Sequence, residues 1–160
     1  MNTFLTPAET RRVVEVLASR PLVRLVTEID DNGAIPPRRL AGTLSDLSLH
    51  QLRGASGTAR AHGLVRIAPG AGLELTDSGV ALADLYDAMA RWARRHAVPA
   101  AVCEFSSRIR AVLDLLAPPL TTEPADGPEK SLVRLRALLI QWLADNPQMA
   151  RAPEAEEPVQ

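Results

Sequence analysis

The side chains best suited to chemistry in this sequence follow Ser48 within a few residues. Ser48 is typical of a helix N-cap, so His50, Gln51 and Arg53 would lie on the first turns of the helix that it opens. Glutamine can pair with adenine through two hydrogen bonds, and arginine can pair with guanine in the same way. In helix-turn-helix complexes, the N-terminal half of the second helix reaches the base edges. The pattern therefore predicts either a surface that reads DNA or the solvent-facing side of an ordinary helix.

Positive charge is concentrated around this segment. Residues 35–66 contain five arginines and one acidic residue, Asp46, although the whole chain of 160 residues has a net charge of −1. Residues 118–160 contain four basic and seven acidic residues. Phosphate contacts require a local excess of this sign, although a solvated face can also carry one. If the segment binds DNA, we expect contacts with the DNA backbone from Arg38, Arg39 and Arg60. Ser48 could contact a phosphate in addition to capping its helix, and the hairpin would contribute a DNA contact from Arg66.

The elements that must position these side chains follow a recognisable order. Apolar spacing and turn residues predict a short helix, a polar turn, a helix that stops at Gly63, and a two-stranded hairpin. We place them at residues 37–44, 45–46, 48–63, 64–67 and 73–75. This order is that of a winged helix-turn-helix. On the second helix we expect Leu49, Leu52, Ser56 and Ala59 to face the core.

Two glycines interrupt the second helix. Gly54 and Gly57 each cost a helix roughly 1 kcal/mol relative to alanine. Either packing holds the helix in spite of them, or its backbone closely approaches another molecule.

Further helices flank this region. Thr6, Pro7 and Glu9 predict a helix over residues 7–19, and the apolar spacing from Leu22 to Ile29 predicts the next one, with a possible short strand at residues 34–35. Thr76 would cap a long amphipathic helix after the hairpin. Two more apolar stripes predict helices after residue 98: Val102, Phe105, Ile109, Val112 and Leu116 on one, and Leu132, Leu135, Leu138, Leu139, Trp142 and Leu143 on the other.

Several of these segments resemble a known class of regulator. They are residues 37–44, 47–49, 61–65 and 73–79, followed by Tyr86, Trp92, Arg94, Arg95 and His96. Together they are similar to the winged-helix transcription regulators of the HxlR and MarR types, over the chain to about His96. The resemblance implies a DNA-binding regulator with a long helix after its wing.

The composition excludes several other classes. Apolar residues make up 46% of the chain and aromatic residues 3%, so the core must consist mostly of Leu, Val and Ala. No apolar run reaches the ~18 residues of a membrane span, and the start lacks the pattern of a signal peptide, which favours a cytoplasmic protein that does not enter a membrane. A single cysteine, three scattered histidines and the lack of catalytic motifs favour a protein without metal, cofactor or enzymatic activity.

A second candidate site is an effector pocket between the winged domain and the later helices. An apolar stripe at helical spacing is also typical of plain core or of a dimer interface, so both alternatives stand. The candidate lining residues are Tyr86, Met89, Trp92, Phe105 and Trp142.

We therefore expect a mainly α fold: a winged helix-turn-helix with a small hairpin wing and additional helices at both ends. The expected parts are an N-terminal helix (1–20), a DNA-binding domain (21–97), a helical dimerisation region (98–146) and a disordered acidic tail (147–160). The expected function is a homodimeric repressor that binds a pseudo-palindromic operator in double-stranded DNA, with a possible small-molecule effector. The alternative is a winged-helix module that binds proteins and not DNA.

Overall fold

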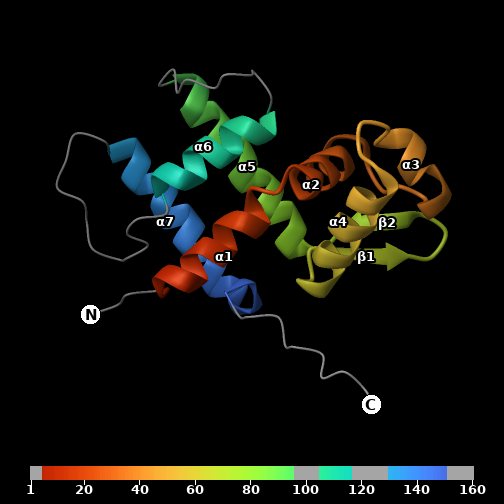
Figure 1. Cartoon of the computed structure of the whole chain (residues 1–160), viewed down its shortest axis with the longest axis horizontal. Helices are drawn as coiled ribbons and strands as arrows, with labels where there is room; N and C mark the ends of the chain where they lie inside the picture. Colours follow the sequence, from red (N-terminus) through yellow and green to blue (C-terminus); the bar gives the residue numbers. More distant parts are fainter. Residues whose placement is uncertain (1–4, 96–104, 117–129, 151–160) are drawn as a thin grey trace, which may run out of the picture.

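The computed structural model of the protein is mainly helical and has one small antiparallel sheet (Figure 1). It describes residues 5–95, 105–116 and 130–150. The helices and strands are α1 (Pro7–Leu17), α2 (Arg20–Asn32), α3 (Leu40–Thr43), α4 (Leu49–Ala61), β1 (Val65–Ala68), β2 (Gly72–Leu75), α5 (Asp77–Arg95), α6 (Phe105–Leu116) and α7 (Lys130–Asp145), with short 3-10 helices η1 (Pro37–Arg39) and η2 (Pro147–Met149). The expectation of a mainly helical chain with a small hairpin is confirmed.

The first helix begins as its capping residues predict. The Thr6 hydroxyl accepts a hydrogen bond from the Glu9 backbone N–H (3.1 Å), and the Glu9 carboxylate accepts one from the Thr6 N–H (3.0 Å). Both bonds satisfy donors that have no partner inside the helix. The helix ends at Leu17, two residues before the expected end, because Ser19 becomes the N-cap position of α2.

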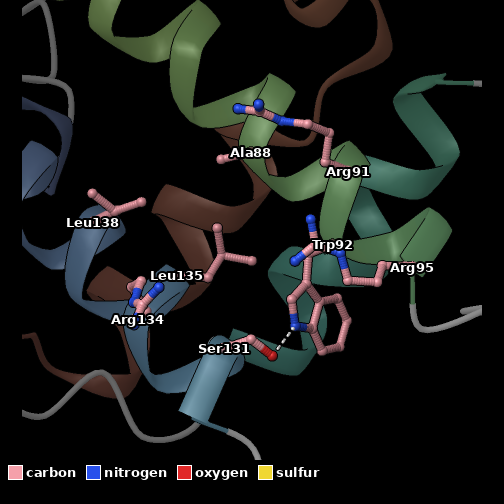
Figure 2. Close-up of a pocket in the computed structure, with 8 residues that line it drawn as sticks. All are labelled: Ala88, Arg91, Trp92, Arg95, Ser131, Arg134, Leu135 and Leu138. Carbon is pink, nitrogen blue, oxygen red and sulfur yellow. Dashed lines mark hydrogen bonds between the residues drawn. The ribbon is translucent and has the colours of Figure 1, made fainter.

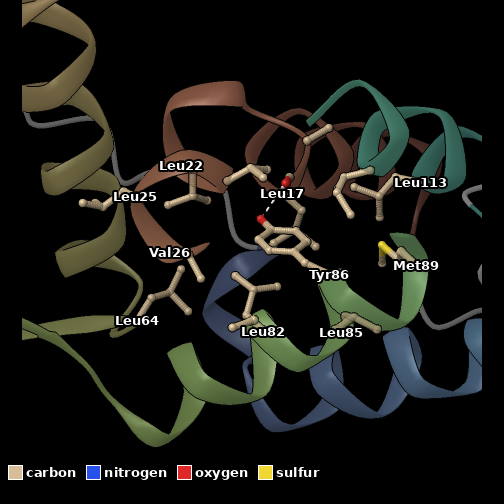
Figure 3. Close-up of a cluster of buried hydrophobic side chains, with 14 of the residues drawn as sticks. Leu17, Leu22, Leu25, Val26, Leu64, Leu82, Leu85, Tyr86, Met89 and Leu113 are labelled. Carbon is tan, nitrogen blue, oxygen red and sulfur yellow. Dashed lines mark hydrogen bonds between the residues drawn. The ribbon is translucent and has the colours of Figure 1, made fainter. Parts of the chain in front are cut away.

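The hydrophobic core is arranged around α5, which packs against α2, α6 and α7. Figure 3 shows leucine and valine side chains from α1, α2, α5 and α6 surrounding Tyr86. The Tyr86 hydroxyl donates to the Leu17 carbonyl oxygen (2.6 Å), and complete burial raises the pKa of this phenol. This hydrogen bond satisfies the Tyr86 hydroxyl group, so the large aromatic ring is buried in the core without an unpaired polar atom.

Helix α6 corrects one expectation about assembly. Its stripe was expected to be free for a dimer interface, but Ile109, Val112 and Leu116 are completely buried within the chain. Helix α6 packs against α1, α2 and α5, so its apolar stripe is covered by helices of the same chain. Phe105 is partly buried, and Val102 lies outside the described residues.

Helix α7 covers a further side of α5, and the chain after it returns to the core. Trp142 is buried and its indole N–H donates to the Ser78 carbonyl oxygen (3.1 Å). The expectation that residues 147–160 form a disordered tail is wrong for its first part, because η2 is ordered and Met149 is 1% exposed. Residues 151–160 lie outside the described part of the chain. The N-terminal and C-terminal helices thus share one core with α2 to α5.

The hairpin pairs β1 with β2 in an antiparallel register that places Val65 opposite Leu75 and Ala68 opposite Gly72. Ile35 adds an isolated bridge to Leu73, which is what remains of the expected third strand. Gly72 has a positive φ of 106°, and a Cβ atom there would collide with the Ile35 backbone. Within the described ranges, no helix combines the length and apolarity that crossing a membrane requires.

Candidate nucleic-acid interface

Asp46 lies in the turn between α3 and α4, the two helices that border the candidate interface. Its carboxylate accepts hydrogen bonds from the Arg24 Nε and Nη2 atoms, both at 2.9 Å, and from Arg20 Nη2 at 2.9 Å. The hydrogen bond with Arg24 and the positive charges of Arg24 and Arg20 lower the pKa of Asp46 well below its usual range. Arg20 and Arg24 thus form an ion cluster with Asp46 that holds this turn against α2, and their positive charges balance the negative charge of Asp46.

Helix α4 begins with a second capping box. The Ser48 hydroxyl accepts from the Gln51 backbone N–H (3.1 Å), and the Gln51 side-chain oxygen accepts from the Ser48 N–H (2.9 Å). Pairing with adenine requires both the oxygen and the nitrogen of the glutamine amide, and the oxygen already serves as a cap. The geometry opposes the expected reading of adenine by Gln51. The serine followed three residues later by glutamine is itself the sequence signal for this cap.

The buried side of α4 differs in part from the expected one. Leu52, Ala55 and Ala59 are buried as the core-facing side of the helix. Leu49 was expected among them, but its side chain is 57% exposed at the start of the helix. Ser56 is only partly buried. The buried side of α4 therefore includes Ala55, which was not expected there, and lacks Leu49.

The opposite side of α4 forms a ridge of exposed residues, which we call the outer ridge. It consists of His50, Arg53, Gly54, Gly57 and Ala61. A Cβ atom added to either glycine would meet no atom within 4 Å in the described part of the chain. Packing inside this region therefore does not require glycine at either position, and the helix backbone is accessible along the ridge.

Two grooves lie beside the outer ridge. The first, the α1–α4 groove, has a volume of about 350 Å³ and is lined by Glu15 and Val16 of α1 together with His50 and Gly54. The second, the α3–α4 groove, has a volume of about 390 Å³ and is lined by Leu40, Leu49, Arg53 and Arg60, among others. The α3 side of the ridge therefore carries positive charge, whereas the α1 side includes a carboxylate.

The remaining predicted arginines lie on neighbouring elements. Arg38 and Arg39 are exposed in η1, directly before α3. On the hairpin, the Arg66 Nε donates to the Glu74 Oε1 across the two strands (2.6 Å). Opposite charges on adjacent strands of a hairpin are a sequence signal for such a pair, so Glu74 could be predicted as the partner of Arg66. Because the charge of Arg66 is paired, the hairpin offers less positive charge than the sequence indicated.

The C-terminal end of α4 is supported by Thr76, after the hairpin, and by Gln148, near the end of the described residues. The Gln148 side-chain nitrogen donates to the His62 carbonyl oxygen (2.9 Å), and the Thr76 hydroxyl donates to the Gly63 carbonyl oxygen (2.5 Å). Burial lowers the pKa of His62, which favours its neutral form. The His62 backbone N–H donates to the Thr58 carbonyl oxygen (3.0 Å), so His62 closes the last turn of α4 through its backbone.

Most of the five residues expected to line an effector pocket are packed into the core. Tyr86 and Met89 are completely buried in the core, and Trp142 is 5% exposed with its indole N–H bonded to Ser78. Phe105 packs against the edge of the core. Trp92 lines a groove between α5 and α7. Helical spacing predicts that these apolar side chains face inward, but it does not distinguish a packed core from the wall of a cavity.

Comparison of the chain with protein-family models, with curated protein sequences and with solved structures finds no match.

Proposed function

We propose that the protein binds double-stranded DNA as a winged helix-turn-helix regulator, with α4 as the recognition helix. The observation that carries the proposal is the outer ridge. It is an exposed helix face, bounded by a groove with two arginines, and the acidic residue of its supporting turn is neutralised by Arg24 and Arg20. A helix that projects with its arginines exposed is the form that enters the major groove.

In the proposed complex, Arg53 reads a guanine and His50 contacts the neighbouring bases or backbone. Arg38, Arg39 and Arg60 contact phosphates on either side. The open backbone at Gly54 and Gly57 lets α4 lie close to the DNA, which answers why glycines occur on an exposed helix face. Ser48 and Gln51 act by capping the helix, and Arg66 contributes through a hairpin on which Glu74 holds its side chain.

The finer part of the proposal is a homodimer on a pseudo-palindromic operator that represses by occluding a promoter. Since the α6 stripe is buried in the chain, a dimer would need a different surface. Leu115 and Leu138 are leucines of the later helices that are exposed, at 45% and 50%. Light scattering across a concentration series tests the dimer independently of DNA.

The second candidate function is a protein-interaction module. The observation in its favour is the apolar part of the α3–α4 groove, where Leu40 and the 57%-exposed Leu49 line a surface that an apolar side chain could fill. Exposed apolar surface beside a polar rim is typical of protein contacts.

Selection of DNA from a random pool separates the two functions. We expect the protein to enrich one sequence class at moderate salt. On the selected site, Arg53→Ala should cost roughly 1–3 kcal/mol and reduce discrimination at one base pair per half-site. Arg39→Ala should instead weaken binding to all sequences and reduce the salt slope by about 1.

Arg94→Ala, an exposed arginine near the C-terminal end of α5 and away from α4, is the matched control and should leave affinity unchanged. If no sequence is enriched, or if folded Arg53→Ala and Arg39→Ala proteins bind as tightly as the wild type, DNA binding through α4 is rejected and the interaction module becomes the better account.

A further inference from the structure

A groove between the C-terminal half of α5 and the N-terminal half of α7 lies away from α4 (Figure 2). Its volume is about 190 Å³. Trp92, Leu135 and Leu138 supply its apolar surface, and three arginines surround them: Arg91 and Arg95 from α5, and Arg134 from α7. Since the lining spans residues 88–95 of one helix and 131–138 of the other, the groove runs for roughly 10 Å along both.

The three arginines place charge of one sign on both walls. All three are exposed, and none forms an ion pair with a carboxylate in the ranges 5–95, 105–116 and 130–150. Arg91 acts on Asp87, one turn earlier on its own helix, only through space: it lowers a pKa that burial raises. Guanidinium groups in this arrangement favour carboxylate or phosphate oxygens, which they can bind through two hydrogen bonds each.

The apolar surface of the groove is fixed on one side and open on the other. The Trp92 indole N–H donates to the Ser131 hydroxyl (3.0 Å), as Figure 2 shows, so its polar atom is satisfied and its ring is held in place between the two helices. Leu135 is also buried, whereas Leu138 is 50% exposed. A ligand that covers Leu138 would remove apolar surface from water.

We propose that this groove binds a free, single-chain anionic amphiphile, such as a medium-chain carboxylate. The head would lie between the arginines and the chain would cover Leu138 and the edge of Trp92. A neutral chain would leave the three charges unpaired, and an anion without a chain would leave the apolar surface open. The length of roughly 10 Å along both helices favours an extended chain over a compact ring system. The site is separate from the outer ridge and does not depend on the DNA-binding proposal.

Isothermal titration calorimetry with octanoate, 1-octanol and acetate tests the chemistry of the ligand. We expect octanoate to bind with one site per chain and to change the tryptophan fluorescence, since Trp92 is one of only two tryptophans. Octanol and acetate should each bind at least about tenfold more weakly, because each lacks one of the two contacts. No octanoate binding up to millimolar concentration, or equal binding of octanol, would overturn the proposal.

Substitutions locate the site. Arg95→Gln and Arg134→Gln should each weaken octanoate binding about tenfold, and Leu138→Gln should weaken it several-fold. Arg94→Gln is the matched control, because Arg94 is exposed on the same helix but does not line the groove. All four changes are at exposed positions, and circular dichroism confirms that each protein is folded. If Arg94→Gln weakens binding as much as Arg134→Gln, the effect is one of general charge and the site is wrong. Binding of the wild type to anionic phospholipid vesicles without any binding of free octanoate would also overturn it.

Discussion

The outer ridge of α4 and the α5–α7 groove both depend on arginine, but the surroundings of the arginines differ. Near α4, Arg20 and Arg24 hold Asp46 and thereby fix a turn, while Arg53 and Arg60 border a groove on an exposed helix with small neighbours. In the α5–α7 groove, three arginines surround a tryptophan and two leucines. The first arrangement offers charge along a projecting helix, and the second offers charge around an apolar surface. Arginine content alone therefore does not indicate the ligand, whereas the neighbours of each arginine do.

Figure 1 places α3, α4 and the hairpin on one side of the molecule and α6 and α7 on the other, with α5 between them. The two regions thus share their support, and a change in the common core should affect both. The expected effects below run from the shared core to the periphery of each region.

The largest expected effect is that of Ile109→Ala in the shared core. Ile109 is completely buried, so its truncation should lower the free energy of unfolding by about 2–5 kcal/mol. Leu115→Ala on the same helix is the control, because Leu115 is 45% exposed and should change stability by less than about 0.5 kcal/mol. Urea denaturation measures both. Equal effects would mean that α6 does not pack on α5 as described.

Gly79→Ala should have the next largest effect, at the junction of the two regions. A Cβ atom at Gly79 would collide with the Leu64 carbonyl oxygen, which belongs to the backbone just after α4 and cannot move alone. We expect a loss of about 1–3 kcal/mol in thermal or urea unfolding. Gly42→Ala, where an added Cβ meets nothing within 4 Å, provides the comparison. A Gly79→Ala protein as stable as the wild type would contradict the close packing of α5 on this backbone.

Gly57→Ala should separate stability from binding on the outer ridge. The added methyl group meets no described atom, so helix propensity should raise stability by up to about 1 kcal/mol. The same methyl group should weaken DNA binding, since the proposed complex brings the α4 backbone close to the DNA. Unfolding curves and fluorescence anisotropy on the selected DNA site measure the two effects. A variant that is more stable and binds DNA as tightly as the wild type would contradict the proposed close approach of the α4 backbone to the DNA.

Asp46→Asn should have the smallest effect, because the ion cluster is partly exposed, with 36% of the Asp46 side chain accessible. We expect a loss of at most about 1 kcal/mol near neutral pH, the usual size for surface pairs. The pKa of Asp46 is lowered in the folded state, so its contribution is present above the unfolded value of about 4 and is lost as the pH falls below it. The stability difference between wild type and Asp46→Asn should therefore shrink below about pH 4 in urea titrations. A difference that grows in acid would contradict this account.

Much of the fold could be predicted from the sequence because it depends on local patterns. Capping residues located the start of α1, and the turn residues between two apolar runs located the hairpin, because both signals act within a few residues. The second capping box was equally local, and Gln51 could have been assigned to it in place of base reading. The fold class was therefore within reach of the sequence, and so was the capping role of Gln51.

Long-range partners were not accessible in the same way. The apolar stripe on α6 is visible in the sequence, but the sequence does not say whether α5 or a second chain covers it. Asp46 lies 22 residues from Arg24, and Trp92 lies 39 residues from Ser131, so neither contact follows from local spacing. The α5–α7 groove depends on how two distant helices meet, which is why the predicted pocket shared only Trp92 with it.

The hydrogen bond from Gln148 to His62 spans 86 residues and has a consequence for synthesis on the ribosome. The end of α4 emerges long before the residues that support it, and the Trp142 contact with the start of α5 is equally late. Since contacts between distant residues form after local ones, we expect α4 and the hairpin to exist first as a loosely held unit. The nascent chain would then acquire a rigid α4 only when η2 closes onto His62, so a translation arrest before Gln148 would leave this helix without its final support.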